Sequence, residues 1–276
     1  MSPPRSKSPA GTSADALGEI PFDLPAVSAA EKRNALALLA MLREAYPDAH
    51  CELNYASPHQ LLVATILSAQ TTDVGVNKAT PALFARFPTP GDYARSSPAE
   101  IEPYVRSLGF FRNKAKSVHL SMRDVHEKHR DIVPRTMDEL VALQGVARKT
   151  ANVVLGNAYG INVGFMVDTH VERLSKRLGL VPRTANVARI ERRLMALFPR
   201  ESWCELSHML IWHGRRACKA RHVACPSHPI CEKFGVCCEL RILGTPTLRV
   251  GSGRTGRAKP HAERGSTRPR KRKPRG

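Results

Sequence analysis

The stretch "LQGVARKTAN", residues 143–152, connects a glycine-containing turn directly to a helix. Apolar residues recur after the turn at positions 151, 154, 155 and 158, which is the spacing of one helical face. Just before the turn, residues 136–139 have the pattern of a capping box, which predicts a short helix up to Leu143. The stretch therefore predicts a helix–hairpin–helix that spans about residues 137–160.

Helical patterns continue on both sides of this hairpin. Predicted helices cover residues 28–46, 58–69, 74–84, 97–109, 112–129, 169–179, 187–197 and 203–213. A capping box marks the start at Ser97, Asp73 is expected to cap the helix that follows it, and Thr169 with Glu172 forms a further capping box. The one strand-like run, residues 161–167, has no partner in the sequence, so we predict an all-α fold with short connections.

The chain has 276 residues and a formal net charge of +19, to which a basic C-terminal stretch contributes strongly. A basic body with a basic tail points to nucleic acid as the partner, whereas a solvated charge run is the alternative for the tail alone. Residues 1–27 and 241–276 are predicted to be disordered because small, proline and charged residues dominate them.

No apolar run is long enough to cross a membrane, and the first residues do not form a secretory signal. We therefore expect a protein of the cell interior without a membrane partner. It would be cytoplasmic and nucleoid-associated in a bacterium, and nuclear in a eukaryote.

Cysteines cluster near the end of the chain, where five of the seven occur. They are Cys218, Cys225, Cys231, Cys237 and Cys238. Such clustering inside a cell indicates metal or cluster ligands rather than disulfides. The gaps of six, five and five residues lack the paired knuckles of common zinc sites, but the spacing leaves both a [4Fe–4S] cluster and zinc open. His228 is either a further ligand or a surface residue, and Cys51 and Cys204 are expected in the core.

The turn at Gly145 can leave backbone N–H groups exposed at a helix N-terminus, where they bind a phosphate without reading the base sequence. We expect Arg148 to strengthen this phosphate site. An ordinary corner between two helices, without a ligand, is the alternative interpretation.

Lys149 lies in the first turn of the helix after Gly145, where the helix dipole and Arg148 both disfavour a charged amine. A lysine amine is nucleophilic only when neutral, so this position favours a catalytic role. Asp168 precedes another helix, and it is either the N-cap of that helix or a carboxylate left available by the Thr169–Glu172 box. The spacing does not show whether Lys149 and Asp168 meet.

Several stretches, taken together, resemble the endonuclease III family of DNA base-excision glycosylases. They are residues 67–73 (LSAQTTD), 76–80 (VNKAT), 145–154 (GVARKTANVV), 167–170 (VDTH), 213–215 (HGR) and the cysteine loop. The resemblance covers about residues 30–240 and implies two helical lobes flanking a DNA-binding cleft. Residues 51–162 would form a six-helix bundle with the helix–hairpin–helix, and residues 28–50 plus 163–240 a lobe with a C-terminal iron–sulfur cluster loop.

The resemblance also implies an activity. The expected substrate is damaged double-stranded DNA, bound by a monomer that excises oxidised pyrimidines and then nicks the strand by β-elimination. Lys149 matches the family's Schiff-base nucleophile and Asp168 its catalytic carboxylate. The implied ligands of the [4Fe–4S] cluster are Cys218, Cys225, Cys231 and Cys237. The implied DNA contacts are Gln70, Leu108, Gly109, Phe110, Gly145, Val146, Ala147 and Arg148.

Three departures from the family pattern are visible. In the hairpin, Gln144 replaces a proline and Ala147 a glycine, so Ala147 would be strained if it needed a positive φ. In the cysteine loop, His228 stands where the third cysteine is usual; we interpret this as a three-residue insertion with Cys231 as third ligand, and Cys238 as fourth ligand is the alternative. Phe110 is bulkier than the usual aliphatic residue.

Two other functions compete with this interpretation. A monofunctional glycosylase for adenine or alkylated bases would not need Lys149. A non-catalytic iron–sulfur DNA-binding protein would not need Asp168. The presence of both side chains favours the bifunctional enzyme.

Overall fold

The structure is a computed structural model that describes residues 19–220 and 228–235. Within these residues all regular structure is helical, which confirms the predicted fold class. The helices are α1 (Ala29–Ala45), α2 (Pro58–Leu67), α3 (Asp73–Arg86), α4 (Pro90–Ala94), α5 (Pro98–Val105), α6 (Phe111–His129), α7 (Met137–Val141), α8 (Arg148–Tyr159), α9 (Thr169–Arg177), α10 (Val187–Leu197), the 3₁₀ turn η2 (Arg200–Ser202), α11 (Trp203–Arg216) and α12 (Pro229–Phe234).

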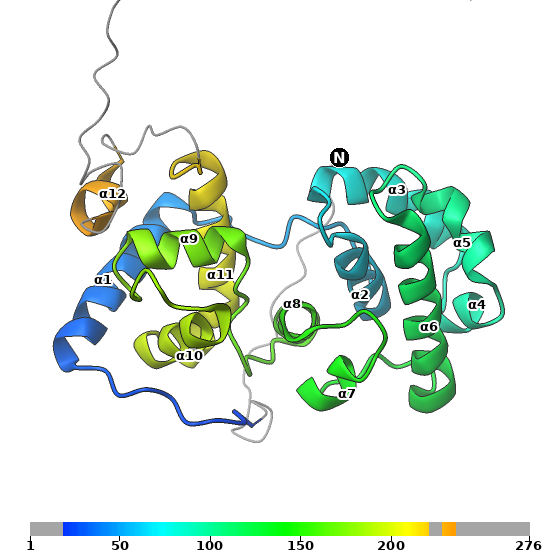
Figure 1. The fold of residues 1–276 in the computed structure, drawn as a ribbon, viewed down its shortest axis with the longest axis horizontal. Helices are drawn as coiled ribbons and strands as arrows, with labels where there is room; N and C mark the ends of the chain where they lie inside the picture. Colours follow the sequence, from blue (N-terminus) through cyan, green and yellow to red (C-terminus); the bar gives the residue numbers. More distant parts are fainter. Residues whose placement is uncertain (1–18, 221–227, 236–276) are drawn as a thin grey trace, which may run out of the picture. The chain divides into compact units, whose positions relative to one another are not determined.

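A first hydrophobic core forms around α2. Every side chain from Leu61 to Leu67 is buried, so this helix is apolar all round and lies inside the lobe rather than on its surface. It packs against α3, α6 and α8, while α4 and α5 lie along α6 (Figure 1). This core places the N-terminal end of α8, and with it the hairpin, against α2 and α6.

A second core is built from α1, α9, α10, α11 and α12. Leu38 and Leu42 of α1 meet Leu206 and Leu210 of α11 in its interior. Ile211, also on α11, packs against both cores and so connects the two groups of helices. The expected pair of helical lobes is thus present, while the domain boundaries given above stay a prediction.

Residues 161–167 connect the two cores without forming a strand. Val163 and Met166 are buried in the first core, whereas Phe165 and Val167 are buried in the second. The strand-like pattern of this run therefore arises because successive side chains enter two different cores. No partner strand is required.

The N-terminal segment differs from the prediction of disorder over residues 1–27. Residues 1–18 lie outside the described part of the chain, but residues 19–27 pack against the second core. The Phe22 ring lies between the guanidinium groups of Arg148 and Arg192, at 5.0 Å and 4.5 Å from its centroid. These cation–π contacts and apolar burial order the segment, although its composition alone does not indicate an apolar anchor.

Two predicted caps are also wrong. Thr72, not Asp73, caps α3, because its hydroxyl accepts the Gly75 N–H at 3.2 Å. Ser97 precedes α5 but its side chain does not cap the backbone; it donates to the Glu100 carboxylate instead. Since α5 ends at Val105 rather than near Gly109, a non-helical turn separates it from α6.

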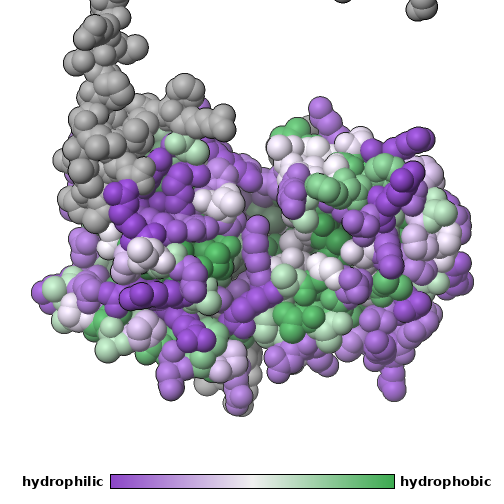
Figure 2. Space-filling model, in the orientation of Figure 1, coloured by the Kyte–Doolittle hydropathy of each residue, from purple (hydrophilic) through white to green (hydrophobic). Residues whose placement is uncertain are grey.

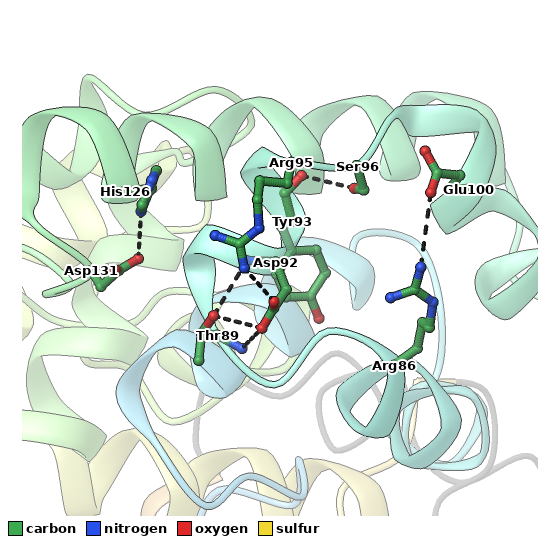
Figure 3. Close-up of polar contacts among 9 residues, drawn as sticks. All are labelled: Arg86, Thr89, Asp92, Tyr93, Arg95, Ser96, Glu100, His126 and Asp131. Atoms are coloured by element: carbon green, nitrogen blue, oxygen red, sulfur yellow. Dashed lines mark hydrogen bonds and ion pairs between the residues drawn. The ribbon is translucent and has the colours of Figure 1, made fainter.

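The short helix α4 was not predicted, because a proline and a glycine occupy its first turn. It is held by a capping box in which Asp92 accepts both the amide and the hydroxyl of Thr89, at 2.9 Å and 2.6 Å (Figure 3). Arg95 donates to the same carboxylate at 2.6 Å. These three groups lower the pKa of Asp92, with the Thr89 hydroxyl as the largest cause.

The described surface is largely hydrophilic, with hydrophobic patches between the polar side chains on the face that Figure 2 shows. In the part of the chain that the structure describes, no helix combines the length and the apolar character needed to cross a membrane.

Candidate active site

The hairpin is formed by α7, the turn at residues 143–147 and α8. Val146 donates its N–H to Leu143 at 3.1 Å, and both side chains are buried, so the turn is fastened to the first core. Gly145 has a φ of +79°, whereas Ala147 is the N-cap of α8 with a φ of −91°. The condition for strain at Ala147, a positive φ, is therefore not met.

Gly145→Ala should destabilise the protein more than the matched change Gly160→Ala. Both glycines have positive φ, which costs a residue with a side chain about 1–2 kcal/mol. A Cβ at Gly145 would also lie 2.8 Å from Ser117 Cβ, while nothing lies within 4 Å of one at Gly160. In Gly145→Ala alone, this crowding should lower the free energy of unfolding by a further amount of about 1–3 kcal/mol, which urea unfolding measures. Equal losses for the two variants would contradict this contact.

Arg148 forms an ion pair within the protein, and its expected role as an added phosphate ligand stays a prediction. Its Nε donates to both oxygens of Glu191 at 3.0 Å, and the Glu191 side chain is only 8% exposed. Asn152 donates to the same carboxylate at 3.2 Å. Arg148 therefore connects the start of α8 to α10.

Glu191→Ala should remove roughly 3 kcal/mol of stability, because it leaves the partly buried Arg148 without its carboxylate. Glu205→Ala is the matched control: Glu205 also binds one arginine, Arg43, through three hydrogen bonds, but both side chains are about half exposed. That exposed pair should contribute less than about 1 kcal/mol. Denaturant midpoints measure both, and a larger loss in Glu205→Ala would refute the proposed role of burial.

Lys149 and Asp168 line the wall of one cavity of about 240 Å³. The lining comes from the residues before α2, the loop before α3, the start of α8, the start of α9 and the inner face of α11. The cavity thus lies between side chains of the two cores. The two residues that the sequence could not bring together therefore share a site.

Asp168 caps α9. Its Oδ1 accepts the Val171 N–H at 2.8 Å, so the proposed cap on Thr169 is wrong. An N-cap carboxylate uses one oxygen for the helix and keeps acceptor capacity on the other. The cap fixes the position of the carboxylate at the cavity wall, so the structural role and a chemical role are compatible.

Asp73 and Arg215 are site residues that sequence reasoning missed. Arg215 donates to Asp73 at 2.7 Å and forms a second ion pair with Glu52; all three residues line the cavity. Burial raises the pKa of Asp73, the charge of Lys149 opposes this shift, and the charge of Asp168 adds to it. Because the charges of Lys149 and Asp168 both act on the carboxyl of Asp73, Lys149 and Asp168 lie close enough to Asp73 for electrostatic interaction with it. Only the three-dimensional arrangement reveals this, because Asp73 fits a helix start equally well.

The two loops predicted to enter DNA contain both exposed and buried side chains. Gln70 lies at the cavity, and Phe110 is 68% exposed; both have a φ in the left-handed region, at 54° and 57°. Such strain is tolerated mainly where function requires it. Leu108, in contrast, is only 3% exposed and its side chain belongs to the first core, while its expected DNA contact stays a prediction.

Gly109 is open to its surroundings, since an added Cβ would find nothing within 4 Å. Lys114 connects the two loops: its N–H donates to the Phe110 carbonyl at 3.0 Å, and its buried ammonium donates to the Thr71 hydroxyl. Phe110 is therefore the large apolar side chain that this turn presents to a partner.

Two of the four predicted cluster ligands lie in the described residues, and both are buried. Arg177 Nη1 lies 3.3 Å from Cys218 Sγ, and His213 Nε2 lies 3.3 Å from Cys231 Sγ. Nitrogen donors next to buried sulfur suit negatively charged thiolates, so this pair fits a thiolate-ligated cluster. Cys225, Cys237 and the alternative ligand Cys238 lie outside the described residues.

A second ligand set is geometrically available beside Cys231. Ligand atoms of His213, His228 and Cys231 all lie within 4.8 Å of one another. Burial, followed by the charges of His228 and Arg173, lowers the pKa of His213 to about 4, so its ring is neutral near pH 7. His228 Nδ1 accepts the Ile230 N–H and so caps α12.

Comparison with known proteins gives consistent results. A family profile described as "HhH-GPD superfamily base excision DNA repair protein" matches residues 63–200. Endonuclease III of Synechocystis is 52% identical over 197 residues, which are 71% of this chain and 90% of that protein. Endonuclease III of Escherichia coli K12 is 39% identical over 204 residues, 73% of this chain and 96% of that protein.

Solved structures are similar as well. A trapped endonuclease III–DNA covalent intermediate matches with a TM-score of 0.70 and 43% identity, covering 73% of this chain and 94% of that chain. A non-covalent endonuclease III–DNA complex matches with a TM-score of 0.73 and 41% identity, covering 77% of this chain and 99% of that chain.

Proposed function

Because this chain belongs to the endonuclease III family and is thus a DNA glycosylase of base excision repair, we propose that it removes oxidised pyrimidines and then nicks the strand. The observation that carries the proposal is the meeting of Lys149 and Asp168 at one cavity. A relative that is 43% identical has been trapped covalently on DNA, which supports a covalent mechanism. We further propose that a monomer acts on damaged double-stranded DNA.

The damaged base must leave the duplex to reach Lys149, because the target atom of a stacked base pair is not accessible to a side chain on a cavity wall. Gln70 and Phe110 stand at strained, exposed positions from which they can occupy the space that the base vacates. The hairpin holds the neighbouring DNA backbone through the N–H groups of the first turn of α8. α8 has neither a side-chain cap nor an acidic residue in its first turn, which leaves its positive end available to a phosphate.

In the first chemical step, the neutral Lys149 amine attacks C1′ of the sugar and the bond to the base breaks. The base leaves with the bonding electrons and takes up a proton. Positive charge develops on the sugar, and the nearby Asp168 carboxylate stabilises it and accepts the proton that the amine releases. The C1′–O4′ bond of the sugar ring then breaks as the nitrogen lone pair forms the C1′=N bond, and O4′ takes up a proton. The enzyme is now joined to C1′ of the opened sugar through a protonated imine.

The imine acidifies the C2′ proton, since the electrons of that C–H bond can move toward the positively charged nitrogen. Loss of the proton expels the 3′ phosphate and so nicks the strand. Asp73, whose pKa burial raises, lines the same cavity and is placed to exchange protons in this step. Water then hydrolyses the imine and regenerates Lys149.

Cys218, Cys225, Cys231 and Cys237 would hold the [4Fe–4S] cluster. When bound, this group supplies a rigid cross-link between α11, the cysteine loop and α12, and an electron-transfer centre. The repair chemistry itself needs only Lys149, the carboxylates and water.

The proposal is tested with purified protein and a labelled duplex that contains one thymine glycol. Base release, a nick at the lesion and a borohydride-dependent covalent adduct are expected together, with an undamaged duplex as control. Base release without a nick would instead identify a monofunctional glycosylase, for which adenine mismatches and alkylated bases are the next substrates. Binding without base release would identify a non-catalytic DNA-binding protein.

A further inference from the structure

His213 begins the His-Gly-Arg motif, and the repair chemistry makes no use of it. The residue is fully buried on α11 and does not itself line the cavity. Its ring meets the edge of Tyr46 at a centroid distance of 5.7 Å and that of His228 at 4.7 Å. A fully buried imidazole without a catalytic role requires another reason for its position.

Both ring nitrogens of His213 have partners. Nδ1 lies 2.8 Å from the Tyr46 hydroxyl, and Nε2 lies 3.3 Å from Cys231 Sγ. A metal-bound sulfur carries no proton and can only accept a hydrogen bond. In the cluster-loaded protein, Nε2 must therefore carry the hydrogen of its contact with Cys231, and Nδ1 is the nitrogen that contacts Tyr46.

Close packing holds this geometry in place. A Cβ on Gly214 would lie 2.8 Å from His170 Nδ1, so only glycine allows α11 to approach α9 this closely. Arg173, on α9, donates to the carbonyls of Gly214 and Cys218 at 3.0 Å each. These contacts fix His213 and Cys218 on the same end of α11.

We propose that His213 donates a hydrogen bond to the Cys231 thiolate of the cluster, that Tyr46 orients it, and that this bond raises the reduction potential of the cluster. Hydrogen bonds to ligand sulfur stabilise the additional negative charge of the reduced state. Cys231 is then the third ligand, as the three-residue insertion requires, and neither histidine ligates the metal.

The competing arrangement, in which His213, His228 and Cys231 bind a metal together, is less consistent with the contacts. His213 has no nitrogen left for a metal once Tyr46 and Cys231 are bonded to it. His228 uses Nδ1 to cap α12, and its Nε2 lies 3.4 Å from the Tyr46 hydroxyl. Arg177 beside Cys218 repeats the pattern of a nitrogen donor next to a ligand sulfur.

The test uses the full chain without DNA, so it is independent of the proposed lyase activity. Iron content, absorption near 400 nm and reduction potential are measured for Tyr46→Phe, His213→Gln and His213→Leu. All should keep the iron content of the unchanged protein. The potential should shift to more negative values in Tyr46→Phe and His213→Leu. The shift should be smaller in His213→Gln, whose amide can still donate to sulfur.

Two further measurements separate orientation from ligation. Tyr46→Phe should add no shift in a His213→Leu background, because Tyr46 acts through His213. His228→Asn, which can still cap α12, should retain iron, whereas Cys231→Ser should lose it. Loss of iron in His213→Gln or His228→Asn, or an unchanged potential in Tyr46→Phe and His213→Gln, would overturn the proposal even if His213→Leu does not fold.

Discussion

Lys149→Ala is expected to abolish the borohydride-dependent adduct and to lower base release and nicking by at least about a thousandfold, because it removes the nucleophile. The variant should fold normally. Lys149 lies in the first turn of α8 on a cavity wall, where alanine is a good helix former and leaves no gap in either core. Trapping gels and single-turnover kinetics on a thymine-glycol duplex measure both effects.

Two controls separate nucleophilicity from charge. Lys149→Arg retains a cation at the same position but cannot form a Schiff base, so it should bind the duplex yet remain inactive. Lys176→Ala removes a lysine of α9 that pairs with Glu172, and it should leave trapping unchanged. An adduct that persists in Lys149→Ala would assign the nucleophile to another amine.

The positions of most helices were predictable from the sequence, whereas the roles of individual polar residues were not. Apolar periodicity located most of the longer helices, since a buried face leaves a repeat that local sequence reveals. Asp73 and Asp168 both lie at the start of a helix, but only one of them is the N-cap. Thr72, the residue before Asp73, caps α3, whereas Asp168 itself caps α9. Two equivalent caps differ by little in free energy, so tertiary contacts decide between them.

Long-range contacts are the part of the site that local sequence does not reveal. Glu191, which is 43 positions later in the chain, binds Arg148, and Leu108 is buried in the first core. The DNA contacts expected of these two residues stay predictions. The family resemblance gave Lys149 and Asp168, whereas their common cavity and the second carboxylate, Asp73, are evident only in the fold.

Asp168→Asn is expected to lower base release by about a hundredfold to ten-thousandfold while barely changing stability. Asparagine caps a helix as well as aspartate does, so its side-chain oxygen can still accept the Val171 N–H. What it lacks is the negative charge that stabilises the sugar cation and accepts the proton from Lys149. The measurements are single-turnover base release and the urea midpoint of the same preparation.

Asp168→Ala removes both the negative charge and the helix cap. It should therefore lower base release as Asp168→Asn does, and it should also lose about 1 kcal/mol of stability because the cap is missing. Asn186→Ala supplies the matched control for the cap alone: Asn186 caps α10 by accepting the Arg189 N–H at 2.9 Å and does not line the cavity. It should lose similar stability and keep full activity. If Asp168→Asn were fully active, the carboxylate at this position would be only a helix cap, and another group would have to stabilise the sugar cation.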